Sequence, residues 1–209
     1  SDQQRRHTVT TLSRTHANVI FLQETHSTPQ SESVWAHEWA KLTRGTSFWH
    51  SGNSMSKGVA ILFKNIRKVK VKNTCSDATG RILSLTITHN KQDLQLTNIY
   101  GPNKASRREH FYEQMSTYIK PNLQGILAGD FNMVMDADKD RTGNTYKHQT
   151  MGSKNLRRIL QQNNLQDAWD KTNQRSDGHT WHNKQVSSRL DRIYAPTGTI
   201  NQTRHHTML

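Results

Sequence analysis

Five polar residues with the potential to do chemistry follow apolar segments that are predicted to be strands. They are Glu24, Tyr100, Asp130, Asn132 and Asp191. Carboxylate and amide oxygens suit hard divalent cations such as Mg²⁺, and a carboxylate can also take a proton from water. The end of a strand is a rigid position, so side chains there can be held together for such chemistry.

Each of these residues also has a purely structural interpretation. Glu24 can cap a turn, Asp130 can form an Asx-turn, and Tyr100 can be a core aromatic residue. Asp191 can pair with a neighbouring arginine on a surface strand. A single residue therefore decides nothing, whereas the occurrence of all of them at strand ends, in one order, is informative.

Apolar periodicity along the chain predicts helices and strands in mixed order. We expect helices over residues 5–17, 34–42, 106–119 and 155–165. We expect strands over residues 18–23, 47–50, 58–63, 68–72, 81–88, 93–100, 125–129, 179–182 and 189–194. This order favours an α/β fold with two sheets covered by helices.

The composition is strongly basic. The 209 residues include 29 Lys and Arg against 16 Asp and Glu, which gives a formal net charge of +13. Such a surplus suits a polyanionic partner such as nucleic acid, or an anionic membrane surface. A single cysteine, Cys75, excludes an internal disulfide and a cysteine-rich zinc site. We find no signal peptide and no apolar segment long enough to span a bilayer.

Four short motifs occur in a fixed order along the chain. They are Gln-Glu-Thr at 23–25, Asn-Ile-Tyr-Gly-Pro at 98–102, Gly-Asp-Phe-Asn at 129–132 and Ser-Arg-Leu-Asp at 188–191. This order resembles the endonuclease/exonuclease/phosphatase superfamily. Within it, the sequence is most similar to the apurinic-endonuclease-like domain of LINE-type (non-LTR) retrotransposons. Residues 138–143, 165–169 and 180–182 strengthen the resemblance, which runs from about residue 5 to 195.

The resemblance implies a four-layer α/β sandwich of the exonuclease III/DNase I type. Two β-sheets would pack face to face, with helices on the outside. Residues 1–209 would form a single, incomplete domain. The superfamily begins with a strand that carries an Asn and ends with a Ser-Asp-His motif, and this sequence matches neither. We therefore expect the fragment to lack the first strand and the last catalytic segment, and to be weak or inactive.

The resemblance also implies roles for individual residues. Glu24 would be the main metal ligand, and Asp130 would orient and deprotonate the attacking water with help from Asn132. Tyr100 would contact the scissile phosphate, and Asp191 would orient a catalytic His. Contacts to DNA are expected from basic and hydroxyl side chains, namely Arg107, Arg108, Lys139, Arg141, Thr180 and Ser188. The basic residues among them can equally be solvated surface charges.

The implied reaction is the nicking of double-stranded DNA with Mg²⁺ as the cofactor, or with Mn²⁺ in its place. It would leave a 5′-phosphate and a 3′-hydroxyl, and the 3′-hydroxyl would prime reverse transcription. The protein would act in the nucleus as a monomeric domain, beside a reverse transcriptase domain in the parent polyprotein. Phosphate neutralisation by Lys and Arg supplies most non-specific DNA affinity, which fits the charge of +13.

Three other functions remain open from the sequence. An apurinic/apyrimidinic repair endonuclease shares the four motifs and would prefer abasic DNA. A phosphatase acting on anionic lipid headgroups is less attractive for so basic a chain. A basic DNA-binding remnant without catalysis would bind DNA in a salt-sensitive manner that does not depend on Glu24 or Asp130.

Overall fold

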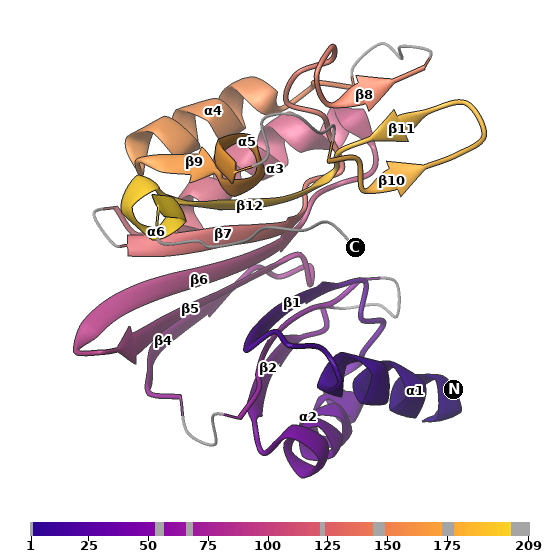
Figure 1. The fold of residues 1–209 in the computed structure, drawn as a ribbon, viewed down its shortest axis with the longest axis vertical. Helices are drawn as coiled ribbons and strands as arrows, with labels where there is room; N and C mark the ends of the chain where they lie inside the picture. Colours follow the sequence, from indigo (N-terminus) through magenta and orange to yellow (C-terminus); the bar gives the residue numbers. More distant parts are fainter. Residues whose placement is uncertain are drawn as a thin grey trace.

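The computed structural model describes residues 2–52, 57–65, 69–121, 124–143, 149–172 and 178–201. Its first half holds two helices and a three-stranded sheet with the order β1-β3-β2. The elements are α1 (Asp2–Ser13), β1 (Val19–Gln23), α2 (Pro29–Thr43), β2 (Thr46–His50) and β3 (Val59–Phe63). Both helices lie on the outer face of this sheet (Figure 1).

Helix α2 has well-defined ends. Thr28 is its N-cap and forms a capping box with Ser31, and Pro29 follows in the first turn. Arg44 ends the helix in the left-handed conformation. The helix thus begins five residues before the expected start at residue 34, because capping signals rather than apolar periodicity set its N-terminus.

The larger sheet has six strands in the order β4-β5-β6-β7-β12-β9. All neighbours are antiparallel except β6 and β7, which run parallel. Its strands are β4 (Val71–Ser76), β5 (Ile82–His89), β6 (Gln92–Tyr100), β7 (Gln124–Asp130), β9 (Leu165–Asp167) and β12 (Asp191–Pro196).

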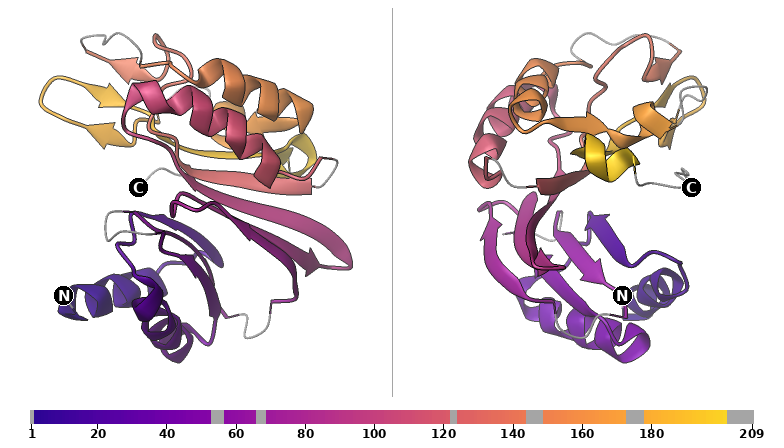
Figure 2. Two further views of the ribbon diagram at one scale, coloured as in Figure 1. Left: turned by 180° about the vertical axis from the view of Figure 1, so that it is seen from behind. Right: turned by 60° about the vertical axis from the view of Figure 1, so that its left-hand side comes forward.

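The two sheets pack face to face. Alternate residues of β3 point in opposite directions: Val59, Ile61 and Phe63 belong to the core shared with β5 and β6, and Ala60 and Leu62 pack toward the outer helices. All five residues of β3 are buried, so an unbroken apolar run is required there. Figure 2 shows the resulting order of layers, and the expected four-layer α/β sandwich is confirmed.

Helices on the other side cover the outer face of the larger sheet (Figure 1). Leu156 and Ile159 of α4 share a core with Tyr112 of α3 and Leu127 of β7. The remaining elements are η1 (Ala105–Arg107), α3 (Arg108–Met115), η2 (Ser116–Tyr118), α4 (Ser153–Gln162), α5 (Ala168–Thr172) and α6 (Thr197–Asn201). The single helix expected over 106–119 is therefore a short α-helix between two 3-10 turns.

A small third sheet stands at one end of the sandwich. Its strands have two residues each and follow the order β10-β11-β8, with bounds Trp181–His182, Ser187–Ser188 and Arg141–Thr142. Pairing this short has no periodicity that a sequence could reveal, and only the strand near residue 180 was expected.

The strand expected over 68–72 lies at Val71–Ser76 instead, and Lys68 is outside the described residues.

No helix in the described part of the chain is long and apolar enough to cross a membrane.

Candidate active site

Sheet register brings three of the expected residues together. Tyr100 at the end of β6 is the partner of Asp130 at the end of β7, and Asp130 is the partner of Asp191 at the start of β12. Neighbouring strands in a sheet lie about 5 Å apart, so the three side chains form one row. Gly129 permits this approach: its φ is +140°, and a Cβ there would lie 2.0 Å from the Ile99 carbonyl oxygen.

Glu24 reaches the same place from the other sheet. It directly follows β1, and its carboxylate accepts a hydrogen bond from the Tyr100 hydroxyl. The Arg81 guanidinium lies 4.7 Å from the centre of the Tyr100 ring and donates to the Tyr100 and Gly101 carbonyl oxygens at 2.8 and 2.9 Å. Tyr100 is therefore fixed between a carboxylate from one sheet and an arginine from its own.

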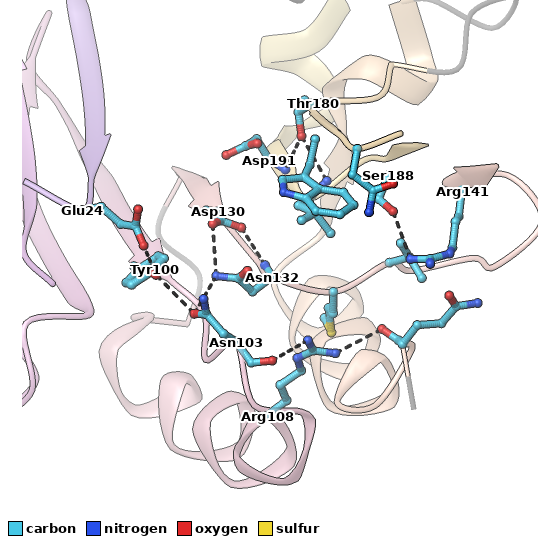
Figure 3. Close-up of a pocket in the computed structure, with 16 residues that line it drawn as sticks. Glu24, Tyr100, Asn103, Arg108, Asp130, Asn132, Arg141, Thr180, Ser188 and Asp191 are labelled. Carbon is cyan, nitrogen blue, oxygen red and sulfur yellow. Dashed lines mark hydrogen bonds between the residues drawn. The ribbon is translucent and has the colours of Figure 1, made fainter. Parts of the chain in front are cut away.

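Asn132 orients the Asp130 carboxylate. The backbone N–H of Asn132 donates to Asp130 Oδ1 at 2.7 Å, and its side-chain amide donates to Oδ2 at 3.0 Å. Asn103 bridges to the Tyr100 side of the cleft, since its Oδ1 lies 3.2 Å from the Tyr100 hydroxyl and 3.3 Å from Asn132 Nδ2. Figure 3 shows these side chains meeting in one cleft. Sequence reasoning missed Asn103, although it immediately follows the 98–102 motif.

Burial and like charges shift the acidity of this group. Burial, followed by the charge of Asp191, raises the pKa of Asp130 to about 7. Burial also raises the pKa of Asp191. Burial and the hydrogen bond to Glu24 raise the pKa of Tyr100 to about 12, so its hydroxyl stays protonated at neutral pH. The cleft thus holds a carboxylate able to exchange a proton near neutral pH and a permanent hydroxyl donor.

The far rim of the cleft comes from the small third sheet. Thr180 Oγ1 accepts the backbone N–H groups of Leu190 and Asp191 at 3.1 and 3.0 Å. Arg141 donates to the Ser188 hydroxyl at 3.2 Å. The cleft has a volume of about 500 Å³. Its lining includes Glu24, Tyr100, Asp130, Asn132, Asp191, Arg141, Thr180, Ser188, Arg108 and Trp181.

A buried group of ion pairs lies behind this rim. Asp140 is 1% exposed and contacts both Arg189 and Arg192, which are 1% and 4% exposed. Arg192 also pairs with Asp167 at 2.7 Å. The arginines beside Asp191 are therefore bound to other carboxylates, and Asp191 itself faces the cleft.

The other expected DNA-binding residues lie in different surroundings. The Arg108 guanidinium donates to the carbonyl oxygens of Pro102, Asn103 and Gln149, and so ties two loops together at the floor of the cleft. Arg107 is exposed on η1 and does not line the cleft. Lys139 also lies outside the lining, with its ammonium 3.1 Å from an Asp170 oxygen.

The donor set of the cleft fits a hard divalent cation. Three carboxylates, those of Glu24, Asp130 and Asp191, line the cleft, and the charges of Asp191 and Glu24 both raise the pKa of Asp130. A cation would relieve that repulsion. Within the described ranges there is no cluster of three or more His, Cys, Asp or Glu side chains with metal-binding geometry. Mg²⁺ does not require one, because it is commonly held by one or two carboxylates and several waters.

Comparison with known sequences decides the family. The profile described as Endonuclease/Exonuclease/phosphatase family matches residues 1–206. The chain belongs to this family. This family consists of nucleases and phosphatases. The expected class of enzyme, a metal-dependent phosphodiesterase, is therefore confirmed at the level of the family.

A relative of this endonuclease/exonuclease/phosphatase chain is the "Transposon TX1 uncharacterized 149 kDa protein" of Xenopus laevis. The two are 32% identical over 198 residues, which cover 91% of this chain and 15% of that protein. The chain therefore corresponds to a small part of its transposon relative.

Solved structures share the fold. An AP endonuclease from Archaeoglobus fulgidus superposes with a TM-score of 0.75 at 16% identity, covering 96% of this chain and 85% of that one. The 3′ phosphatase NExo from Neisseria, bound to a product DNA hairpin, gives a TM-score of 0.73 at 16% identity with the same coverage. At this identity the likeness establishes the fold alone.

Proposed function

We propose that this chain is the Mg²⁺-dependent endonuclease domain of a LINE-type retrotransposon protein and nicks double-stranded DNA. The observation that carries the proposal is the convergence of Glu24, Tyr100 and Asp130 from two sheets in one cleft. A net charge of +13 and the similarity to a transposon protein support DNA as the substrate.

The side chains can divide the work of phosphodiester hydrolysis. Glu24 would hold the cation, and Tyr100, on giving up its hydrogen bond to Glu24, would donate a hydrogen bond to a phosphate oxygen as negative charge develops there. Asp130, oriented by its two hydrogen bonds from Asn132, would accept the proton of the attacking water. Its raised pKa suits this role at neutral pH. When bound, the cation supplies Lewis-acid stabilisation of the phosphate charge.

Asp191 and the rim of the cleft have supporting roles in the proposal. Asp191 would position a general acid or a phosphate contact beside Asp130, which is its partner in the sheet. Thr180 and Arg141 would contact the DNA backbone on the far side of the cleft, and Ser188, which is 1% exposed, would act through the hydrogen bond that it accepts from Arg141. Arg107, Arg108 and Lys139 stay predicted contributors to DNA affinity, with Arg108 acting through the loops that it ties together.

The similarity to a transposon protein supports a wider setting for the proposed reaction. Nicking would leave a 5′-phosphate and a 3′-hydroxyl, and the 3′-hydroxyl would prime reverse transcription. A reverse transcriptase domain in the same polyprotein would use that primer on chromosomal DNA in the nucleus. Within that polyprotein, residues 1–209 would form one domain that acts as a monomer. A polymerase-extension assay on nicked plasmid checks the proposed 3′-hydroxyl, because only that end can be extended.

Nicking of supercoiled plasmid with Mg²⁺ tests the central proposal. Because the sequence lacks a match to the superfamily's first and last motifs, we expect weak nicking, which EDTA abolishes and which Asp130→Ala and Glu24→Ala each reduce by about 10²-fold or more. Ser84→Ala is the matched control, since Ser84 is 2% exposed and hydrogen-bonded within the larger sheet. Nicking that persists in EDTA or in Asp130→Ala overturns the mechanism. Salt-sensitive DNA binding without nicking would favour a non-catalytic binding domain.

A further inference from the structure

A chain of hydrogen-bonded side chains runs behind Glu24, away from the cleft. Thr25 Oγ1 lies 2.8 Å from Ser27 Oγ, which lies 2.7 Å from Ser51 Oγ. Ser51 then donates its hydroxyl to Glu32 Oε1 at 2.6 Å and its backbone N–H to the same oxygen at 3.0 Å. Ser27 and Ser51 are each 1% exposed, so the middle of this series of hydrogen bonds is shielded from water, whereas Thr25 and Glu32 at its two ends are half-buried.

The Glu32 carboxylate gives the chain a single direction. A carboxylate only accepts, so Ser51 must donate its one hydroxyl proton to Glu32. Ser51 can then only accept from Ser27, and Ser27 can only accept from Thr25. All three hydroxyl protons therefore point toward Glu32, and such aligned bonds strengthen one another in a low-dielectric interior.

The backbone that this chain holds is unusual. Glu24 and His26 have positive φ angles of 50° and 49°, which non-glycine residues rarely adopt. The Thr25 and His26 N–H groups donate to the carbonyl oxygens of Gly58 and Lys57, at 3.2 and 2.9 Å. Such a conformation persists only where the surroundings determine it strongly. The series of hydrogen bonds toward Glu32 begins within this loop, at Thr25, the residue that follows Glu24.

The hydrogen bonds that link Thr25 to Glu32 are not part of the N-terminal cap of α2. Glu32 lies in the first turn of α2, but the capping box there is already complete between Thr28 and Ser31. The Glu32 oxygen instead binds Ser51, which is 19 residues away and follows β2. The chain therefore connects the start of α2, the end of β2 and the loop after β1.

We propose that Ser27, Ser51 and Glu32 are positioning residues that hold the 24–26 loop, and with it the Glu24 carboxylate, in the geometry that binds the divalent cation. None of the three lines the cleft that Glu24 enters (Figure 3), so each acts through the loop. The inference rests on the proposed function of Glu24 as the metal ligand. Partners hydrogen-bonded directly to a metal ligand commonly change metal affinity by about tenfold or more, and Ser27, Ser51 and Glu32 act at one further remove, through the backbone of the loop.

Two measurements on the same proteins test this inference without relying on activity. Free Mn²⁺, followed by electron paramagnetic resonance, reports cation affinity, since carboxylate sites accept Mn²⁺ as well as Mg²⁺. Amide hydrogen exchange of metal-free protein reports the opening of the loop at Thr25 and His26. The variants are Ser27→Ala, Ser51→Ala and Glu32→Gln, with Ser84→Ala as the buried-serine control and Glu24→Ala as the reference for a lost ligand.

We expect Ser27→Ala and Ser51→Ala to weaken Mn²⁺ binding several-fold, up to about tenfold, and to speed exchange at Thr25 and His26. Glu32→Gln keeps an oxygen acceptor for Ser51, so this variant should lose less Mn²⁺ affinity than the two serine variants. Ser84→Ala should match the parent protein in both measurements. An equal loss of Mn²⁺ affinity in Ser84→Ala would indicate general destabilisation and overturn the inference.

The failure of the inference differs from the failure of the proposed metal ligand. Unchanged exchange at Thr25 and His26 overturns the positioning role. So does unchanged Mn²⁺ affinity in Ser27→Ala and Ser51→Ala when Glu24→Ala weakens it. If Glu24→Ala itself leaves Mn²⁺ binding unaltered, Glu24 is not the metal ligand, and the proposed function and this inference both fall at that step.

Discussion

Asp130 and Asp191 are directly opposed partners in the antiparallel ladder between β7 and β12. Opposed residues in a sheet have Cβ atoms about 5 Å apart, and like charges at that spacing repel. Burial first, and this repulsion second, raise the pKa of Asp130 to about 7. Burial in the fold and the pairing of two distant strands, rather than any local motif, therefore set the acidity of the carboxylate that we propose as the base.

Removal of the Asp191 charge should lower the pKa of Asp130. In metal-free Asp191→Asn we expect a pKa clearly below 7 but still above the ordinary value of about 4, because burial is the larger cause. Carboxyl ¹³C NMR across a pH series measures it directly. A pKa that stays at about 7 in the variant would mean that burial alone sets it.

The raised pKa of Asp130 also predicts how stability depends on pH. Between about pH 4 and 7 the folded state binds the Asp130 proton that the unfolded state has lost. This contribution to the free energy of unfolding therefore decreases as pH rises, and above pH 7 the ionised carboxylate is fully destabilising.

Asp130→Asn should accordingly stabilise the protein by about 1 to 2 kcal/mol at pH 8. The gain is limited because the variant amide loses one of the two hydrogen bonds from Asn132. At pH 4 the gain should vanish. Urea unfolding at the two pH values tests both signs, and a variant less stable than the parent protein at pH 8 would contradict the argument.

The ion pairs behind the cleft should be costly to break. Asp140→Asn removes one carboxylate from the buried guanidinium groups of Arg189 and Arg192, which keep their pairs with Asp167 and Asp170, and we expect a loss of about 3 kcal/mol in the free energy of unfolding. Lys139→Ala is the control, because the Lys139 side chain is 57% exposed and its pair with Asp170 should contribute at most about 1 kcal/mol. Similar losses in urea unfolding of the two variants would refute this distinction.

Gly58 is the glycine at which a methyl group should disturb the Glu24 loop. Its φ is +102°, and a Cβ there would lie 2.2 Å from Thr25 Oγ1 and 3.3 Å from Ser27 Oγ. We expect Gly58→Ala to lose at least about 1 kcal/mol of stability and also to weaken Mn²⁺ binding. Gly198→Ala is the control, since nothing lies within 4 Å of its Cβ position. Calorimetric melting with and without Mn²⁺ compares the two, and unaltered binding in Gly58→Ala would count against a coupled loop.

The sequence predicted those features that depend on neighbouring residues. An apolar run followed by a polar residue predicts a buried strand with a functional side chain at its end, and this placed Glu24, Tyr100 and Asp130 correctly at strand ends. The unbroken apolar run at Val59–Phe63 likewise predicted a strand, and the structure shows that all five of its residues are buried. The family motifs supplied the four-layer order of sheets and helices, which local patterns alone do not fix.

Features that depend on distant residues were not predictable in this way. Nothing near Arg189 in the sequence indicates that its partner is Asp140, 49 residues away. Asn103 and Arg81 enter the site through hydrogen bonds that form only when β5, β6 and the loop after β7 meet. The boundaries of α2 and of the broken helix near residue 110 depended on capping and packing rather than on periodicity.

The sequence by itself thus determined which chemical groups the protein carries and which strand ends present them, because apolar patterning and short motifs act over a few residues. Only the tertiary structure decided how those groups affect one another. The opposition of Asp130 to Asp191, the contact of Tyr100 with Glu24 and the buried link from Glu32 to Ser27 each join segments far apart in the chain. Electrostatic repulsion and hydrogen bonding act over a few ångströms of space, and the folded arrangement of the sheets sets those distances.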